Sequence, residues 1–341
     1  MNAQLQNAMS LPLDKLSRPV HDLRVSVIEA CNFRCPYCMP ADKTPDDTTL
    51  QNAARLTFDQ IEQVVKAFVK LGVRKLRLTG GEPLLRKNLP ELIERLARIA
   101  ELEDIALTTN GSLLEKQAQA LKQAGLHRLT VSLDALDADV FSQLSGGRGQ
   151  VQDVLNGIEA AEAAGFSSLK INAVIQRGIN EDQVLPLVEK FRGTKHVLRF
   201  IEYMDVGNCN GWSMQDVVPS KQLQTLINQR WPLQPVSANY RGEVASRYRF
   251  ADGQGELGFV SSVSEPFCGD CHRARLSADG HVYTCLFAGK GHDIRAELEL
   301  GEDVLNQKLN KIWTNRADRY SELRHSQTKH NKKIEMYFIG G

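Results

Sequence analysis

A regular alternation of short apolar strands and amphipathic helices runs through the first two thirds of the chain. Strands are expected at 23–28, 75–79, 105–109, 128–133, 169–174 and 197–201. Helices are expected between them at 57–71, 90–100, 113–124, 151–164 and 182–191. Successive strands joined by crossover helices pair in parallel, with right-handed connections. The alternation therefore predicts an α/β fold, a partial TIM-like barrel of six βα units.

The alternation weakens after residue 210. Residues 211–219 resemble a boundary, residues 220–229 are expected to form a helix, and residues 240–263 read as short strands with glycines at the turns. We therefore expect two domains, the barrel at 1–215 and a smaller α+β region at 216–341 that closes it.

Three cysteines, Cys31, Cys35 and Cys38, follow the first expected strand directly. Thiolates are soft ligands that suit iron-sulfur clusters, and three of them leave one iron of a four-iron cluster open to another ligand. A structural zinc site normally takes four ligands, and no fourth Cys or His lies nearby. The spacing thus favours a cluster over zinc. In a barrel this loop belongs to the catalytic rim, where the strands end.

Several expected strands carry cations on one face, although strands of a covered parallel sheet are normally apolar. The alternating positions are Arg24, Lys75, Arg77, Lys170 and Arg199. Unpaired buried cations cost several kcal/mol, so an inward set indicates a polar cavity around an anionic ligand. Arginine and lysine suit phosphates, and we infer a ligand with several phosphate groups. The alternative is that these cations pair with Glu29, Glu82 or Glu202.

A second triplet, Cys268, Cys271 and Cys285, lies in the smaller region. Taken alone it is compatible with zinc, completed by His272 or His281, or with an iron-sulfur cluster. The first triplet favours the cluster.

Composition excludes some classes of function. The chain has 341 residues, seven cysteines and a net charge of +1. The odd cysteine count and the absence of a leader-like N-terminus argue for a reducing cytoplasm. No apolar run predicts a membrane span, and the near-neutral charge argues against nucleic-acid binding.

The spacing C-x3-C-x2-C, with Tyr37 before the third cysteine, resembles the cluster loop of the radical S-adenosylmethionine (SAM) enzymes. The segment Gly80-Gly81-Glu82-Pro83 resembles the motif that contacts the SAM amino group in that family. The resemblance implies that a cluster cleaves SAM to a 5′-deoxyadenosyl radical. It also implies SAM contacts, namely Tyr37, Gly81, Ser132 and Met204.

A more specific resemblance covers nearly the whole chain. The two triplets, the Arg273-Ala-Arg275 segment and the terminal Gly340-Gly341 closely resemble the GTP 3′,8-cyclases of molybdenum cofactor biosynthesis. The resemblance implies two [4Fe-4S] clusters, the second of which binds the guanine of GTP. The implied GTP contacts are Arg24, Lys75, Arg77, Thr108, Lys170, Arg199, Arg273 and Arg275. The implied catalytic residues are Arg273, Arg275, Gly340 and Gly341.

The implied activity is that of a lyase. The radical removes the C3′ hydrogen of GTP, and the C3′ radical attacks C8 of guanine. An electron and a proton then quench the aminyl radical to give 3′,8-cyclo-7,8-dihydro-GTP. A homodimer, a reductant protein and a downstream pyranopterin-forming enzyme are the implied partners. Strand alternation leaves open whether Thr108 or Thr109 faces inward. The alternatives are a radical SAM enzyme that modifies peptides or matures sulfatases, and a zinc-binding nucleic-acid module.

Overall fold

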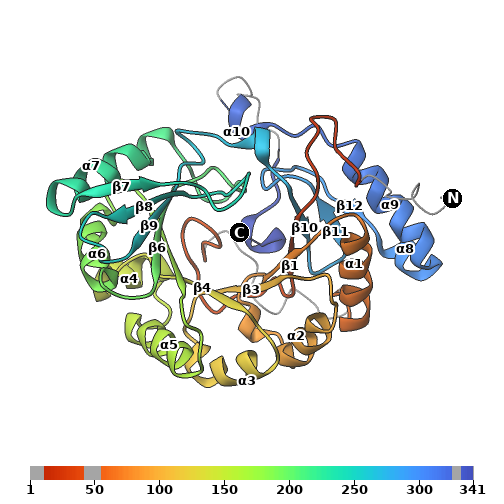
Figure 1. Cartoon of the computed structure of the whole chain (residues 1–341), viewed down its shortest axis with the longest axis horizontal. Coiled ribbons are helices and arrows are strands. Elements are labelled where there is room, and N and C mark those ends of the chain that lie inside the picture. Colours follow the sequence, from red (N-terminus) through yellow and green to blue (C-terminus); the bar gives the residue numbers. More distant parts are fainter. Residues whose placement is uncertain (1–10, 42–54, 325–331, 341) are drawn as a thin grey trace, which may run out of the picture.

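The computed structural model describes residues 11–41, 55–324 and 332–340, and within them one 12-stranded sheet organises the molecule. Its centre is formed by six parallel strands in sequence order (Figure 1). These are β1 (Asp22–Ser26), β2 (Lys75–Thr79), β3 (Asp104–Thr109), β4 (Arg128–Ser132), β5 (Lys170–Ile175) and β6 (Val197–Glu202). The six predicted strands are thus confirmed, with bounds shifted by one or two residues.

Helices cover the convex side of this sheet (Figure 1). They are α1 (Phe58–Lys70), α2 (Leu89–Ala97), α3 (Ala118–Gln123), α4 (Ala138–Ser145), α5 (Val151–Ala163) and α6 (Val184–Phe191). The prediction missed α4. The helix expected at 113–124 begins as a 3-10 turn, Leu114–Lys116, and becomes α-helical only at Ala118.

The C-terminal strands extend the same sheet at both edges. On one side β9 (Glu256–Val260) pairs in parallel with β6 and is followed by β8 (Ser246–Phe250) and β7 (Leu233–Val236). On the other side β10 (Arg273–Leu276) pairs in parallel with β1 and leads to β11 (His281–Tyr283) and β12 (His292–Asp293). The edges β7 and β12 do not meet, so the barrel is partial, as predicted. The boundary at residue 215 stays a prediction.

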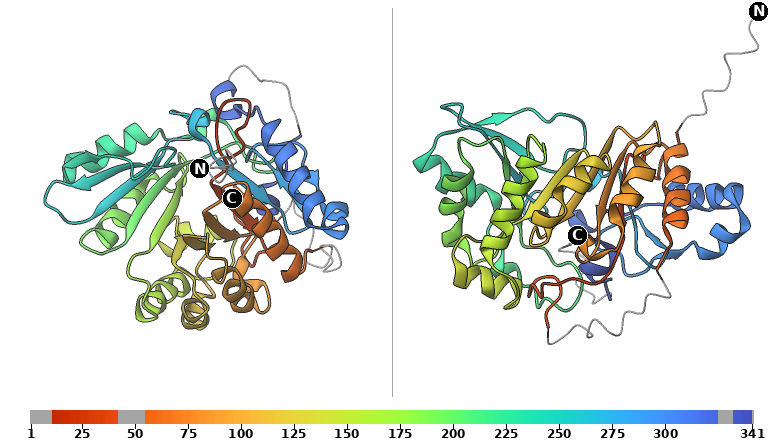
Figure 2. Two further views of the ribbon diagram at one scale, coloured as in Figure 1. Left: turned by 45° about the vertical axis from the view of Figure 1, so that its right-hand side comes forward. Right: turned by 90° about the horizontal axis from the view of Figure 1, so that it is seen from below.

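The remaining helices belong to the C-terminal region. They are α7 (Ser220–Arg230), α8 (Arg295–Leu300), α9 (Glu302–Thr314), α10 (Tyr320–Leu323) and α11 (Met336–Ile339). Helices α8 and α9 lie beside α1, whereas the short α11 lies inside the curve of the sheet (Figures 1 and 2). The chain therefore brings its last described residues back to the concave side of β1.

The strands separate apolar and polar side chains onto opposite faces. Leu23 and Val25 of β1 are fully buried, as are Leu76 and Leu78 of β2, and they join the core under the helices. The intervening Arg24 and its counterparts on neighbouring strands point to the concave side. No helix within the described ranges has the length and apolar character needed to cross a membrane.

Candidate active site

The loop after β1 holds the first cysteine triplet in a tight turn. Cys35 O accepts hydrogen bonds from the backbone N–H groups of Cys38 and Met39, at 2.9 and 2.8 Å. Burial raises the pKa of Cys31 to about 11. Burial and the neighbouring thiols also raise the pKa values of Cys35 and Cys38. A bound cation would offset the cost of ionising them, because metal ligation requires the thiolate form.

The Gly-Gly-Glu-Pro segment packs directly against this loop. The backbone N–H of Gly81 donates to Ile28 O at 2.7 Å, and a Cβ at Gly81 would lie 2.2 Å from Ala30 O. Only glycine allows this approach. Glu82 is buried and accepts hydrogen bonds from Thr109 Oγ1 at 2.7 Å and from the Asn110 backbone N–H at 2.7 Å.

Tyr37 lies beside the ends of β4 and β5. Its hydroxyl donates to Asp134 Oδ2 at 2.7 Å, and Asp134 Oδ1 accepts from the Val174 backbone N–H at 2.8 Å. Burial raises the pKa of Asp134 to about 6, although the Tyr37 hydrogen bond opposes the shift. Ser132 ends β4 opposite Asn172 of β5. These side chains form the rim above the strand ends.

A cavity of about 230 Å³ occupies the concave side of the sheet. All eight predicted GTP contacts line it, together with Met204 and the whole second triplet. The lining does not include Tyr37, Gly81, Ser132 or the first triplet, which lie at or beyond the ends of their strands. The sequence therefore predicted a set of residues that the fold brings to one place.

Strand β3 resolves the ambiguity between its two threonines. Thr108 lines the cavity and its Oγ1 accepts from Arg77 Nη1 at 2.9 Å, whereas Thr109 bonds Glu82 on the other face. The Arg77 guanidinium also donates to Thr130 Oγ1 at 3.0 Å. Thr108 is thus the inward residue.

The cavity has an excess of positive charge. Burial, with Arg199, Arg128 and Arg77 nearby, lowers the pKa of Lys170 to about 6. Burial and Arg77 lower the pKa of Arg199 to about 10, and its Nε is buried without a hydrogen-bond partner. These lowered pKa values indicate a site in which a bound anion would stabilise the charged forms of the side chains.

The proposed carboxylate partners for these cations are engaged elsewhere. Glu29 pairs with Arg55, and Glu82 bonds Thr109 and backbone groups. Glu202 accepts from the Ser220 and Val263 backbone N–H groups, both at 2.8 Å. The alternative that Glu29, Glu82 and Glu202 neutralise the cavity cations is therefore wrong.

The second triplet lies against the basic wall of the cavity. Arg273 Nη2 is 3.2 Å from Cys271 Sγ, and Arg316 Nη1 donates to Cys271 O at 2.6 Å. Burial opposes ionisation of Cys271, but the charges of Arg273 and Arg316 outweigh it and lower the pKa to about 6. Burial raises the pKa of Cys285 to about 12.

The C-terminal tail enters the concave side next to these residues. Arg275 Nη1 hydrogen-bonds to Gly340 O, and Gly340 has a φ of +70°. A Cβ at Gly340 would lie 2.2 Å from Thr79 Cγ2, at the end of β2. Gly341 lies outside the described residues.

Comparisons with known proteins place this geometry in a family. The Radical SAM superfamily model matches residues 25–191, and the Molybdenum Cofactor Synthesis C model matches residues 196–322. The GTP 3′,8-cyclase of Xanthomonas campestris pv. campestris is 65% identical over 328 residues, 96% of this chain and 97% of the relative. The chain belongs to the GTP 3′,8-cyclase family.

A more distant member of the family extends the sequence match, and a solved structure shares the fold. The GTP 3′,8-cyclase of Acidothermus cellulolyticus is 46% identical over 98% of this chain and 100% of the relative. Streptococcus suis SuiB bound to S-adenosylmethionine shares the fold, with a TM-score of 0.60 at 16% identity, over 92% of this chain and 69% of that chain. Membership in the cyclase family favours the main interpretation over a peptide-modifying radical SAM enzyme.

Sequence reasoning missed several residues of this site. Arg128, the first residue of β4, lines the cavity and donates from Nε to Asp104 Oδ1 at 2.6 Å. Its alternation with Thr130 and Ser132 could have identified it. Tyr240 lies under Lys75, whose Nζ is 3.4 Å from the ring centroid. No pattern in the sequence joins Tyr240 to the barrel.

Proposed function

We propose that the cavity of this member of the GTP 3′,8-cyclase family binds GTP and catalyses its conversion to 3′,8-cyclo-7,8-dihydro-GTP, the first step of molybdenum cofactor biosynthesis. One observation carries the proposal. The cavity that borders the second cysteine triplet is lined by nine lysine and arginine side chains and only four carboxylates, and β1, which supplies Arg24 to it, leads into the loop of the first triplet. GTP supplies both the negative charge and the ring system that such a cavity requires.

The triphosphate would bind the basic wall of the cavity. Arg24, Lys75, Arg77, Thr108, Lys170 and Arg199 line the cavity from β1, β2, β3, β5 and β6, and Arg24 lies opposite Arg77 in the register of β1 and β2. Arginine binds phosphate oxygens in a bidentate manner, and lysine acts as a point charge. Binding by residues of rigid strands would fix the ribose relative to the rim.

The cysteine triplets fit [4Fe-4S] clusters. Among the described residues, neither triplet is a group whose three ligand atoms all lie within 4.8 Å of one another. A single zinc ion needs such closeness, whereas a four-iron cluster binds each cysteine at a different corner. His272 and His281, the predicted fourth zinc ligands, face Asp22 and Asp279 instead. These contacts support a second cluster at Cys268, Cys271 and Cys285.

The rim would bind SAM. We assign the SAM contacts to Tyr37, Gly81, Ser132 and Met204. Tyr37 belongs to the loop of the first triplet and its hydroxyl is fixed by Asp134, and Gly81 packs against Ala30 at the start of that loop. When bound there, the cluster and SAM supply a carbon-centred radical for removal of the C3′ hydrogen. The chain's own residues position GTP and exclude water.

The tail and the two arginines would complete the reaction site. Arg273 lies beside Cys271, and Arg275 holds the Gly340 carbonyl. In this arrangement Arg275 orients the tail, and Arg273 neutralises charge beside the second cluster. We propose that Gly341, which lies outside the described residues, also takes part in the reaction.

The proposal includes partners and a compartment. Cysteine thiols that hold oxygen-sensitive clusters require a reducing environment, so we place the protein in the cytoplasm. A homodimer, a reductant protein and a pyranopterin-forming enzyme that takes the product are the partners that we propose.

Anaerobic reconstitution with iron and sulfide, followed by incubation with SAM, dithionite and GTP, tests the function. We expect about eight irons per chain, 5′-deoxyadenosine formation that depends on GTP, and a cyclised GTP identified by mass spectrometry. Iron near four per chain would contradict the second cluster. SAM cleavage with no GTP product would contradict the substrate assignment.

A further inference from the structure

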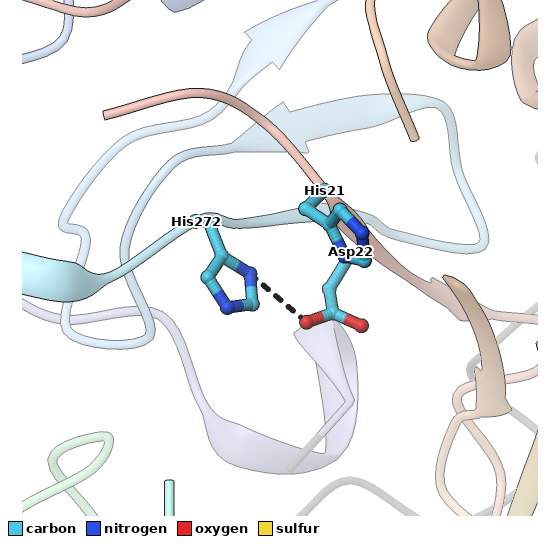
Figure 3. Close-up of side chains that lie close together, drawn as sticks. All are labelled: His21, Asp22 and His272. Atoms are coloured by element: carbon cyan, nitrogen blue, oxygen red, sulfur yellow. Dashed lines mark ion pairs between the residues drawn. The ribbon is translucent and has the colours of Figure 1, made fainter. Parts of the chain in front are cut away.

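Two histidines and an aspartate meet where β1 and β10 begin, at the other end of β1 from the loop of Cys31, Cys35 and Cys38. His21 precedes β1, His272 directly follows Cys271 and precedes β10, and these strands pair in parallel. The His21 backbone N–H donates to His272 O at 2.9 Å, and the two ring centroids are 5.5 Å apart. Figure 3 shows the Asp22 carboxylate beside the His272 ring, with Asp22 Oδ2 3.0 Å from His272 Nδ1.

Two ring nitrogens of this cluster have neither a hydrogen bond nor an ion pair. They are His21 Nδ1 and His272 Nε2, which are buried and have no partner among the described residues, whereas His272 Nδ1 contacts Asp22. His272 is only 7% exposed. A buried polar atom left without a partner costs about 1–3 kcal/mol, so such atoms normally face a water or an ion. An imidazole binds one ion through one nitrogen, so each histidine can offer one nitrogen, beside the Asp22 carboxylate, to a shared ligand.

The three side chains also have the spacing of a metal site. One ligand atom from each lies within 4.8 Å of the others. Atoms bound tetrahedrally to one ion by bonds of about 2.1 Å are about 3.4 Å apart, so side-chain shifts of up to about 1.4 Å would close the site. Two imidazoles and one carboxylate suit zinc and iron(II), whereas magnesium prefers oxygen ligands.

We propose that His21, Asp22 and His272 bind one divalent transition-metal ion, for which Zn²⁺ is the probe. This site is separate from the clusters and does not depend on the proposed reaction. The ion would join the starts of β1 and β10, the strands that carry Arg24, Arg273 and Arg275. Asp22 also lines the large cavity, so the ion would stabilise the cavity wall at this end.

The surrounding charges are compatible with a cation. Two negative charges favour a cation here. Glu103 interacts electrostatically with His21, and the Asp22 carboxylate belongs to the site itself. The positive charge of Lys75 opposes binding, but its ammonium group lies over the Tyr240 ring, 3.4 Å from the centroid. The hollow beside the cluster is lined by His21, Glu103, Arg241 and His272 and offers a path from solvent.

The test uses the reconstituted holoenzyme, so that the cysteines are already occupied. After treatment with a chelating resin, the enzyme is dialysed against Zn²⁺ and analysed by inductively coupled plasma mass spectrometry. We expect about one zinc per chain, lost in His21→Asn and in Asp22→Asn without a change in iron. His292→Asn, at an exposed histidine of β12, is the matched control and should retain the zinc.

A second measurement, on the wild-type holoenzyme, keeps the proposal testable if a variant folds poorly. Zn²⁺ should raise the Tm of the wild-type holoenzyme by a few degrees, because a ligand that binds only the folded state stabilises it, and should leave the Tm of His21→Asn unchanged. One more iron in the wild type than in His21→Asn, with equal cluster absorbance, would support the same site occupied by Fe²⁺. Absence of bound metal, or equal zinc in the wild type and both variants, would overturn the proposal.

Discussion

Cys38 and Cys271 are both buried thiols of three-cysteine groups, yet their surroundings shift the pKa in opposite directions. Around Cys38, burial raises the pKa, and the nearby thiols and Glu335 raise it further. Around Cys271, Arg273 and Arg316 outweigh burial and lower the pKa to about 6. The first triplet therefore depends on its metal to become ionised, whereas the second has a thiolate stabilised in advance.

The contrast shows how the two ends of the active site differ. Arg273, which lowers the pKa of Cys271, is also one of the cavity cations that we assign to GTP. The same positive charge would therefore act on the second triplet and on the substrate. The rim around the first triplet has buried carboxyl groups, Glu82 and Asp134, with raised pKa values of about 7 and about 6. One end is suited to an anionic substrate and the other to a cationic one such as SAM.

The largest expected effect separates the two triplets. Cys35→Ala should abolish both SAM cleavage and GTP cyclisation, while Cys271→Ala should retain SAM cleavage and lose cyclisation. Iron should fall from about eight to about four per chain in each variant. The measurements are iron content and chromatography of 5′-deoxyadenosine and cyclised GTP. Cys209→Ala, outside both triplets, should keep the wild-type iron content. Loss of SAM cleavage in Cys271→Ala with four irons retained would remove the distinction.

The next effect concerns the tail, which contacts both ends of the site. Gly340→Ala places a Cβ 2.2 Å from Thr79 Cγ2 in a left-handed backbone, and should reduce turnover about 100-fold because the tail is displaced. Iron content should not change. Gly211→Ala is the matched control, since Gly211 has φ +62° and nothing within 4 Å of the added Cβ. Equal loss in both variants would indicate backbone strain and not the approach to Thr79.

A smaller effect tests the unpaired charge of the basic wall. Arg199→Met removes a buried cation whose Nε has no partner. The free energy of unfolding without GTP should rise by about 1–2 kcal/mol, because an uncompensated charge is removed. GTP affinity should fall about tenfold, since a hydrogen bond to a charged group is lost. Denaturant titration and equilibrium dialysis measure the two quantities, and a fall in both would contradict an uncompensated charge at this position.

The smallest effect is a proton taken up on binding. Without ligand, the pKa of Lys170 is about 6, so at pH 8 this amine is neutral. A triphosphate beside it favours the charged form and raises the pKa, so GTP binding should take up close to one proton per site at pH 8. Affinity should rise as the pH falls from 8 toward 6. Calorimetry in buffers of different ionisation enthalpy measures the uptake.

Lys170→Gln is the control for this proton. Because glutamine does not titrate, the uptake should disappear while GTP still binds, more weakly. Unchanged uptake in Lys170→Gln would assign the proton to another group, such as the triphosphate itself.

Much of the fold followed from local patterns. The six strands were predicted because short apolar runs alternate with helical patterns, and the α1 N-cap at Thr57, with its capping box to Gln60, likewise depends only on neighbours in sequence. Helix α4 was missed because it buries few apolar side chains, and because an aspartate such as its N-cap Asp137 is equally common in turns.

The residues of the site also divide into those with a local sequence signal and those without one. Arg24 and Arg77 could be predicted because strand alternation assigns them to one face. Arg128 was missed although it alternates with Thr130 and Ser132, because those two side chains are uncharged and do not mark this face of β4 as basic. The role of Asp134 in holding Tyr37 depends on a contact across 97 positions of sequence, which no periodicity records.

The sequence by itself determined the parallel strands, the two cysteine triplets and the side of each strand that carries charge, because these depend on residue type and short-range spacing. The tertiary structure decided which charges remain unpaired. Glu29, Glu82 and Glu202 are taken by other partners, and β10 brings Arg273 and Arg275 beside Arg24 through pairing with β1. Electrostatic balance in a cavity depends on distances between residues far apart in the chain, and only the folded sheet sets those distances.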